Sequence, residues 1–400
     1  MNDKNEEHTM LSTPLTPAFV HGAAEIETTE RGLRPHRLPQ WARTQFPDPH
    51  LLMMEAQPSG VRLELTTAAR TVAVVTHPSR LAYRGADRPR GSVDLVVDGV
   101  PVASSPLDGG DVVLADLQTG ATEFLPGSAH TTTFDGLPAG EKRVEVWLPH
   151  NESVELIELR TDEPVAPVEQ DRPVWLHHGS SISHGSNAST PTQIWPAVAA
   201  RLGDVSLRNL GLGGNALVDP FVARTIRDAP ADVISVKLGI NVVNLDGMRL
   251  RTFVPAVHGF LDTIRDGHPT TPLLLVSPIF CGIHEDTPGP GAVDPESLGT
   301  DQVRFVATGR SEEQQQGKLT LRVIRDALAS VVEHRADDVN LHYLDGTALY
   351  GADDAVDHPL PDALHPDTAT HRIIGERFAA HAFSGTGPFG RTTARGTARR

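Results

Sequence analysis

A change of hydrophobic pattern near residue 173 constrains the fold more than any other feature of the sequence. From about residue 18 to 162, apolar and polar residues alternate in short runs, which is the pattern of half-buried β-strands. From residue 173 onward, short apolar runs are separated by stretches whose apolar residues recur at helical spacing. Two such patterns in a chain of 400 residues predict two domains.

The first pattern predicts a β-sandwich, jelly-roll-like in its arrangement, over residues 18–162. Asp98-Gly99 tolerates positive φ angles and joins strands predicted at 93–97 and 100–103 into a hairpin. Helical signals are scarce in this half of the chain. Further strands are predicted at 61–65, 71–75, 142–148 and 153–159.

The second pattern predicts an α/β domain over residues 173–384. Amphipathic stretches such as that from Leu250 to Ile264 separate its strands. Such alternation implies a parallel sheet with helices on both faces. The strands are predicted at 174–177, 205–210, 233–238, 273–278 and 340–344.

The remaining segments have neither pattern. We predict a disordered arm at residues 1–17, an acidic linker with two prolines at 163–172 and a disordered basic tail at 385–400. A long segment rich in proline and glycine, residues 281–317, is either a functional lid or disordered.

Composition and charge exclude several classes of function. The formal net charge of −16 argues against nucleic-acid and anionic-membrane partners, which favour clustered Lys and Arg. No apolar run approaches the roughly 18 residues of a membrane span. The single cysteine, Cys281, excludes an intramolecular disulfide, and the polar N-terminus has no signal-peptide pattern. We therefore expect a cytoplasmic location.

Residues that can carry chemistry follow successive strands, and ligands bind at the carboxyl ends of such strands. After the first strand, Gly179-Ser180-Ser181 places a serine on a tight turn before a helix, although a serine-rich N-cap loop has the same pattern. After the third strand, Gly239-Ile240-Asn241 offers a side-chain amide to an oxyanion, or a plain turn residue.

The second strand is followed by a glycine-rich run, residues 209–215, in which Gly214 lets a backbone N–H approach a substrate closely. A tight strand-to-helix turn explains the same residues. A dinucleotide-binding loop is disfavoured, because Ala216 stands where the third glycine of that motif is required.

The last predicted strand is followed by Asp362-Ala-Leu-His365-Pro366. The proline favours an extended conformation at His365. An aspartate three residues before a histidine can fix the imidazole tautomer and stabilise the imidazolium. Together with Ser181, these residues supply a nucleophile, a base and an orienter of that base.

In this order, the motifs resemble those of the SGNH (also called GDSL) hydrolase superfamily over roughly residues 173–384. The resemblance implies a flavodoxin-like three-layer domain with about five parallel strands. It implies Ser181 as nucleophile with His365 and Asp362 as its partners. The oxyanion hole would comprise the N–H groups of Ser181 and Gly214 and the Asn241 side chain.

The sequence departs from the superfamily at two positions, where Ser180 and Val242 replace the usual aspartates. Both changes bear on loop geometry. The β-rich first half is similar to that of two-domain members whose sandwich resembles carbohydrate-binding modules, a layout also found in acyltransferases of natural-product biosynthesis.

Other site types fit the sequence less well. A generic α/β-hydrolase motif would need glycine where Ser183 stands. We expect no metal and no other cofactor, because the histidine clusters lack a convincing ligand spacing. These clusters are His177, His178 and His184, and His284 with Glu285 and Asp286.

The resulting hypothesis is a serine acyl-ester hydrolase that acts through an acyl-enzyme on a small ester, thioester or O-acetyl substrate. One alternative is an acyltransferase whose acceptor is an alcohol of a carbohydrate or natural product. The other is a non-catalytic glycan-binding protein. Reactivity of Ser181 distinguishes the enzymes from the binding protein, and added alcohols distinguish transfer from hydrolysis.

Overall fold

The computed structural model describes residues 10–84, 89–116, 119–297, 300 and 303–390. Its contacts divide the chain into two units, Met1–His36 with Ala56–Gln170, and Arg37–Glu55 with Asp171–Arg400. Residues 1–9 of the predicted arm, 391–400 of the predicted tail, and 298–299 and 301–302 of the segment 281–317 lie outside the described residues.

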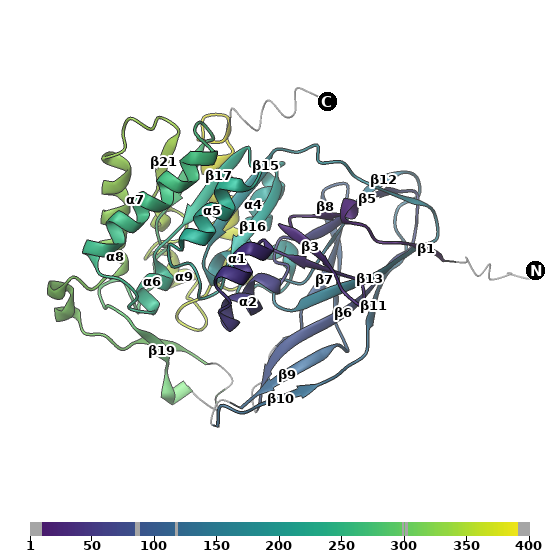
Figure 1. Cartoon of the computed structure of the whole chain (residues 1–400), viewed down its shortest axis with the longest axis horizontal. Coiled ribbons are helices and arrows are strands. Elements are labelled where there is room, and N and C mark those ends of the chain that lie inside the picture. Colours follow the sequence, from purple (N-terminus) through teal and green to yellow (C-terminus); the bar gives the residue numbers. More distant parts are fainter. Residues whose placement is uncertain (1–9, 85–88, 117–118, 298–299, 301–302, 391–400) are drawn as a thin grey trace, which may run out of the picture. The chain divides into compact units, whose positions relative to one another are not determined.

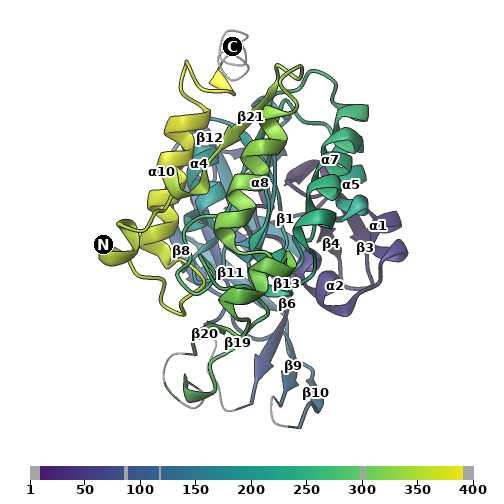
Figure 2. The ribbon, with the colours of Figure 1, turned by 90° about the vertical axis from the view of Figure 1, so that its left-hand side faces the viewer.

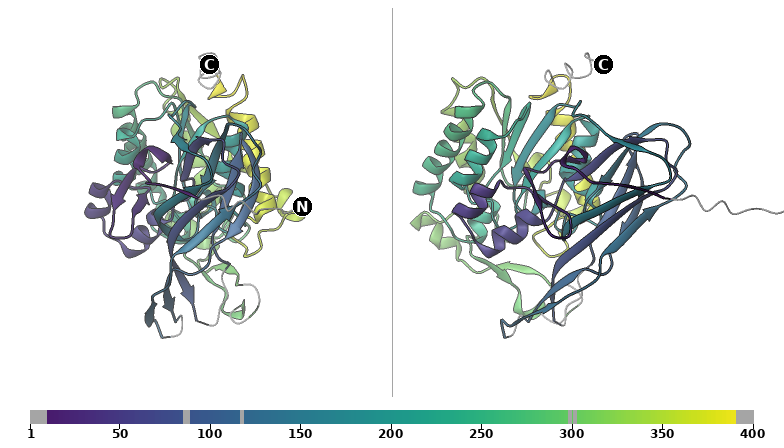
Figure 3. Two further views of the ribbon diagram at one scale, coloured as in Figure 1. Left: turned by 90° about the vertical axis from the view of Figure 1, so that its right-hand side faces the viewer. Right: turned by 45° about the vertical axis from the view of Figure 1, so that its right-hand side comes forward.

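The first unit consists of two sheets (Figure 3). Apolar side chains from strands of both sheets form one core. The larger sheet contains β1 (Leu11–Thr13), β3 (Glu25–Thr28), β4 (Leu33–His36), β6 (Val72–Tyr83), β9 (Asp111–Ala115), β10 (Thr122–Leu125), β11 (His130–Phe134) and β13 (Ser153–Thr161). The smaller sheet contains β2 (Val20–His21), β5 (Arg62–Thr67), β7 (Ser92–Val97), β8 (Val100–Pro106), β12 (Lys142–Trp147) and β14 (Val165–Pro167). In the β7–β8 turn, Asp98 and Gly99 have the expected positive φ angles of 48° and 80°.

The segments predicted as a disordered arm, a linker and a disordered tail are partly built into the fold. In the predicted arm, β1 pairs with β13. In the predicted linker, β14 pairs with the edge of β5. In the predicted tail, the Phe389 ring is fully buried and lies 5.6 Å from Phe383. Short segments show little periodicity, and their partners are distant in sequence. Composition alone therefore did not reveal that parts of these segments are ordered.

The second unit contains a five-stranded parallel sheet in the order β16-β15-β17-β18-β21, which is the flavodoxin-like order 2-1-3-4-5. Its strands are β15 (Val174–Gly179), β16 (Ser206–Gly211), β17 (Val233–Lys237), β18 (Leu273–Val276) and β21 (Leu341–Leu344). All five predicted strands are confirmed. They are almost fully buried, which explains their continuous apolar runs.

Helices cover both faces of this sheet (Figure 2). One layer holds α4 (Trp195–Leu202) and α10 (Thr368–Ala382), and the other holds α5 (Pro220–Asp228), α7 (Leu250–Gly267) and α8 (Leu321–Glu333). The α7 helix buries the stripe that its sequence predicts, including Phe253, Val257 and Ile264. Shorter helices are α3 (Ser181–His184), α6 (Ile240–Asn244) and α9 (Asp354–Asp357), and a two-stranded sheet joins β19 (Gly291–Val293) to β20 (Phe305–Ala307). No helix among the described residues is long and apolar enough to cross a membrane.

A helical segment from the first half of the chain, residues 37–55, belongs to the second unit. It contains α1 (Gln40–Gln45) and most of α2 (Pro49–Ala56), which Figure 1 shows in purple. Leu38, Ala42 and Leu51 are buried in the core that also holds the parallel sheet. The predicted boundaries placed this segment in the β domain, since they were drawn from sequence order.

The burial of Leu51 gives a test of this assignment. Leu51→Ala should lower the free energy of unfolding by about 2–5 kcal/mol, because the lost side chain leaves a cavity in a packed core. Urea unfolding followed by circular dichroism measures the change. Leu202→Ala is the matched control, since Leu202 is 58% exposed and its loss should cost less than about 1 kcal/mol. Equal effects would place Leu51 outside the core.

Candidate active site

The site begins where β15 ends and α3 begins. Ser181 is the first residue of α3, and its Oγ lies 2.9 Å from Nε2 of His365. These two residues are 184 positions apart in sequence. The parallel sheet brings them together because β15 and the chain that follows β21 reach the same edge.

Asp362 holds the other side of the His365 ring. Its Oδ2 lies 2.8 Å from Nδ1 of His365, and its Oδ1 accepts the backbone N–H groups of His365 and Leu364 at 2.6 and 2.9 Å. Burial acts to raise the pKa of Asp362, but these bonds and the charge of His365 outweigh it, so the pKa is lowered. The carboxylate therefore stays ionised and fixes Nδ1 as the donor, leaving Nε2 to face Ser181.

The turn that carries Asp362 and His365 is supported from the segment 281–317. Ala363 has a φ of 67°, an uncommon angle for a non-glycine residue. Its carbonyl accepts the Cys281 thiol at 3.4 Å, and burial raises the pKa of Cys281 to about 12, so this donor stays protonated. The Phe305 N–H donates to the Asp362 carbonyl at 2.9 Å, and the Phe305 ring meets His365 edge-on at 5.7 Å. The described part of this segment is thus folded against the Asp–His turn.

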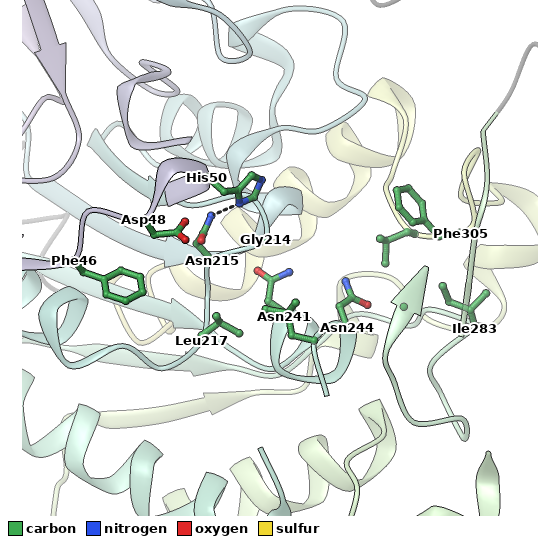
Figure 4. A pocket seen from close by; sticks show the side chains of 13 residues that line it. Phe46, Asp48, His50, Gly214, Asn215, Leu217, Asn241, Asn244, Ile283 and Phe305 are labelled. Atoms are coloured by element: carbon green, nitrogen blue, oxygen red, sulfur yellow. Dashed lines mark hydrogen bonds between the residues drawn. The ribbon is translucent and has the colours of Figure 1, made fainter. Parts of the chain in front are cut away.

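The two other predicted residues, Gly214 and Asn241, line one cavity (Figure 4). Oδ1 of Asn241 accepts the Ala216 N–H at 3.0 Å, which fixes the amide and leaves its NH2 group as a donor. Gly214 has a φ of 68°, an angle that favours glycine. Two residues that follow different strands, one with a backbone N–H and one with a side-chain amide, therefore line the same cavity.

The cavity has a volume of about 410 Å³ and mainly apolar walls. Its lining comprises Phe46, Asp48, His50, Gly214, Asn215, Leu217, Asn241, Asn244, Leu245, Ile283, Gly291, Phe305 and Leu364. A few polar groups on an apolar wall are typical of a small-molecule site.

The histidines that could suggest a metal site have other partners. His177 bonds the hydroxyls of Ser235 and Ser183 at 2.7 and 2.8 Å. His178 donates from Nδ1 to the Leu210 carbonyl at 2.8 Å. Within the described residues, no group of three or more His, Cys, Asp or Glu side chains is arranged to hold a metal ion.

Sequence reasoning missed several residues of the site, among them Asn187, His50 and Phe305. Asn187 donates to Oδ2 of Asp362 at 3.0 Å, and His50 bonds Asn215 at 3.0 Å. No local motif marks them, because each meets its partner only after folding. The sole signal was the length of the segment that contains Phe305.

The two departures from the superfamily pattern have different surroundings. Val242 is buried in the apolar core, where an aspartate would be costly. The Ser180 hydroxyl is buried and has no hydrogen-bond partner among the described residues.

Fold and site together define the class: an SGNH-type α/β domain preceded by a β-rich domain. Residues 178–373 match the GDSL-like lipase/acylhydrolase family, and residues 18–156 match the N-terminal domain of SsfX3. The chain therefore contains a GDSL-like lipase/acylhydrolase domain over residues 178–373. A search of curated proteins gave no match.

Solved structures share the two-domain layout. The salicylyl-acyltransferase SsfX3 from a tetracycline biosynthetic pathway is 29% identical, with a TM-score of 0.75 over 92% of this chain and 95% of that one. A candidate GDSL-like lipase from Bacteroides ovatus is 18% identical, with a TM-score of 0.64 over 92% and 96%. A family two carbohydrate esterase from Cellvibrio japonicus is 14% identical, with a TM-score of 0.54 over 93% and 96%. The last two show the fold alone.

The Asn187–Asp362 bond leads to a first prediction for the site. Asn187→Gly should lower kcat about three- to tenfold, because Asp362 loses one donor that holds it against His365. Asn187 has a φ of 66°, so glycine removes the side chain without backbone strain. Steady-state kinetics on a nitrophenyl ester measures the change. A fall seen in Asn187→Ala but not in Asn187→Gly would assign it to strain instead.

Two buried histidines predict a loss of stability in acid. Burial lowers the pKa values of His178 and His371 to about 4. The unfolded chain binds these protons near pH 6.5, so stability is full above that pH and falls as the pH drops toward 4. At pH 5 each histidine should cost about 2 kcal/mol.

Urea unfolding at pH 7.5 and 5.0 tests this dependence. In His178→Leu and His371→Gln, the difference in unfolding free energy between the two pH values should shrink, whatever the stability at pH 7.5. An unchanged difference in both variants would contradict the assignment of these groups.

Proposed function

We propose that the protein is a serine acyl-ester enzyme in which Ser181, His365 and Asp362 form the catalytic triad. The observation that carries this assignment is a chain of two hydrogen bonds. One joins Ser181 Oγ to His365 Nε2 at 2.9 Å, and the other joins His365 Nδ1 to Asp362 Oδ2 at 2.8 Å. A serine hydroxyl is a weak nucleophile, and a positioned neutral imidazole activates it by accepting its proton.

In the proposed mechanism, His365 takes the Ser181 proton while Oγ attacks an ester or thioester carbonyl. The backbone N–H groups of Ser181 and Gly214 and the Asn241 amide donate to the oxyanion. The imidazolium then protonates the leaving group, and an acyl-enzyme forms. Water or an acceptor hydroxyl, deprotonated by His365, attacks that ester and releases Ser181.

Transfer to an alcohol is the second candidate for the same acyl-enzyme. The resemblance to the salicylyl-acyltransferase supports it, because that similarity extends over both units. A small-molecule acyl donor and a natural-product or carbohydrate hydroxyl would then be the two substrates. Hydrolysis follows where water reaches the acyl-enzyme before an alcohol does.

Covalent labelling of Ser181 tests the proposal. Intact-mass spectrometry after incubation with p-nitrophenyl acetate and a fluorophosphonate should show one adduct on the wild type and none on Ser181→Ala, which should also lose nitrophenol release. Added alcohols that yield a new ester distinguish transfer from hydrolysis. A folded wild type without any adduct would support the non-catalytic glycan-binding alternative, which glycan arrays would then examine.

A further inference from the structure

We propose that His50 is an acyl-recognition residue, whose Nε2–H donates a hydrogen bond to an oxygen atom within the acyl group of the substrate. The inference rests on the proposed function, since it assigns an acyl class to the same site. The favoured acyl group is longer than acetyl, with an apolar body and an ether, hydroxyl or carbonyl oxygen.

The segment that carries His50, residues 37–55, is held in its unit by buried hydrogen bonds. Arg37 is fully buried and donates to the carbonyls of Asn209 and Gly211 at 3.2 and 2.6 Å. The Glu55 carboxylate accepts the N–H groups of Arg37 and Leu38, which closes the segment at its two ends.

Aromatic contacts fix the outer part of this segment. The Arg224 guanidinium lies 4.6 Å from the Trp41 ring centroid, and Phe46 stacks on Phe221 at 5.5 Å. Both partners belong to α5, which packs against α1. The wall that contains Phe46 and His50 is therefore part of the folded unit.

The contact with Asn215 sets the tautomer of His50. The Asn215 amide nitrogen donates to the Gly213 carbonyl at 2.6 Å and lies 3.0 Å from Nδ1 of His50 (Figure 4). The first bond orients the amide, so Nδ1 of His50 must accept the second. The neutral ring then carries its proton on Nε2, and this N–H is the group that His50 can offer to a ligand.

The His50 ring lies beside Gly214, and thus near the proposed position of the reacting carbonyl. The His50 ring covers Gly214, where a Cβ would come within 2.8 Å of its Cε1 atom. Gly214 is the proposed backbone donor to the oxyanion. A substrate whose carbonyl oxygen lies at Gly214 and Asn241 therefore extends past His50 within a few bonds.

We assign the end of the cavity that contains His50 to the acyl group. The leaving group must lie beside His365, because that ring protonates it. Phe305 touches His365, and Figure 4 shows Phe305 and Ile283 on one side of Asn241 and Phe46, Leu217 and His50 on the other. The far end is left for the acyl chain; it holds the Phe46 and Leu217 side chains, the His50 imidazole and the Asp48 carboxylate. Oδ1 of Asp48 accepts the Leu51 N–H at 2.8 Å.

A series of nitrophenyl esters tests the proposal. The methoxyacetate, 3-methoxypropanoate and 4-methoxybutanoate are compared with their hydrocarbon isosteres, the butanoate, pentanoate and hexanoate. The ratio of kcat/KM within each pair is measured for the wild type and for His50→Leu. For at least one pair, the wild-type ratio should exceed the variant ratio by about fivefold or more, the typical effect of one hydrogen bond.

Two further variants separate recognition from folding. His50→Gln should retain most of the ratio, because the amide keeps an acceptor for Asn215 and a donor for the ligand. His334→Leu, at the end of α8, is the matched histidine control and should behave as the wild type.

Fluorophosphonate labelling of Ser181 is measured in every variant. Normal labelling with equal ratios in the wild type and His50→Leu, for all three pairs, would overturn the role of His50. The absence of labelling in the folded wild type would instead overturn the proposed function itself.

Discussion

The parallel register of β15 with β16 and β17 places the ends of three strands at one edge of the sheet, and the polar groups of the site follow these ends. β15 leads to Ser181, β16 to Gly214 and β17 to Asn241. The strands carry side chains that are packed on both faces of the sheet, so a shift of register would disrupt the packing of both faces. The packed core thus fixes the relative positions of the site residues, although Ser181 and His365 are far apart in the sequence.

Buried charge links the helical segment 37–55 to the same edge of the sheet. The Arg37 guanidinium meets two carbonyls at the end of β16, just before the loop that holds Gly214. Burial lowers the pKa of Arg37 to about 9, while the nearby Glu55 acts to raise it, so the side chain stays charged at neutral pH. A buried guanidinium needs acceptors, and Nη1 and Nη2 of Arg37 have them, whereas its Nε has no partner among the described residues. These bonds therefore hold the segment and the glycine loop in one arrangement.

Sequence patterns predicted the parts of the molecule in which local periodicity and burial agree. The five parallel strands, the β7–β8 hairpin and the apolar stripe of α7 belong to this group. The meeting of Ser181, Asp362 and His365 was predictable because Asp and His share one turn and the motifs follow strand ends. The segment 37–55 was not, since its helices gain stability from α5 and β16, more than 150 residues away. Phe305 and Asn187 were missed for the same reason. They contact His365 and Asp362, which are distant in sequence, and no spacing of residues predicts these contacts.

In the proposed acyl-enzyme, whether water or an alcohol attacks depends on the access and position of the nucleophile rather than on its intrinsic reactivity. In the proposed mechanism the triad treats both nucleophiles alike, because His365 accepts a proton from either. What differs is the binding of the nucleophile before attack, which gives an alcohol a high effective concentration only where a surface holds it. In this unit the candidate surface is the end of the cavity near Phe305 and Ile283, where the Phe305 ring contacts His365; the walls of the cavity as a whole are mainly apolar. Apolar walls hold water poorly and bind the carbon skeleton of an acceptor well. The same fold can therefore support hydrolysis or transfer, according to the side chains at this end of the cavity.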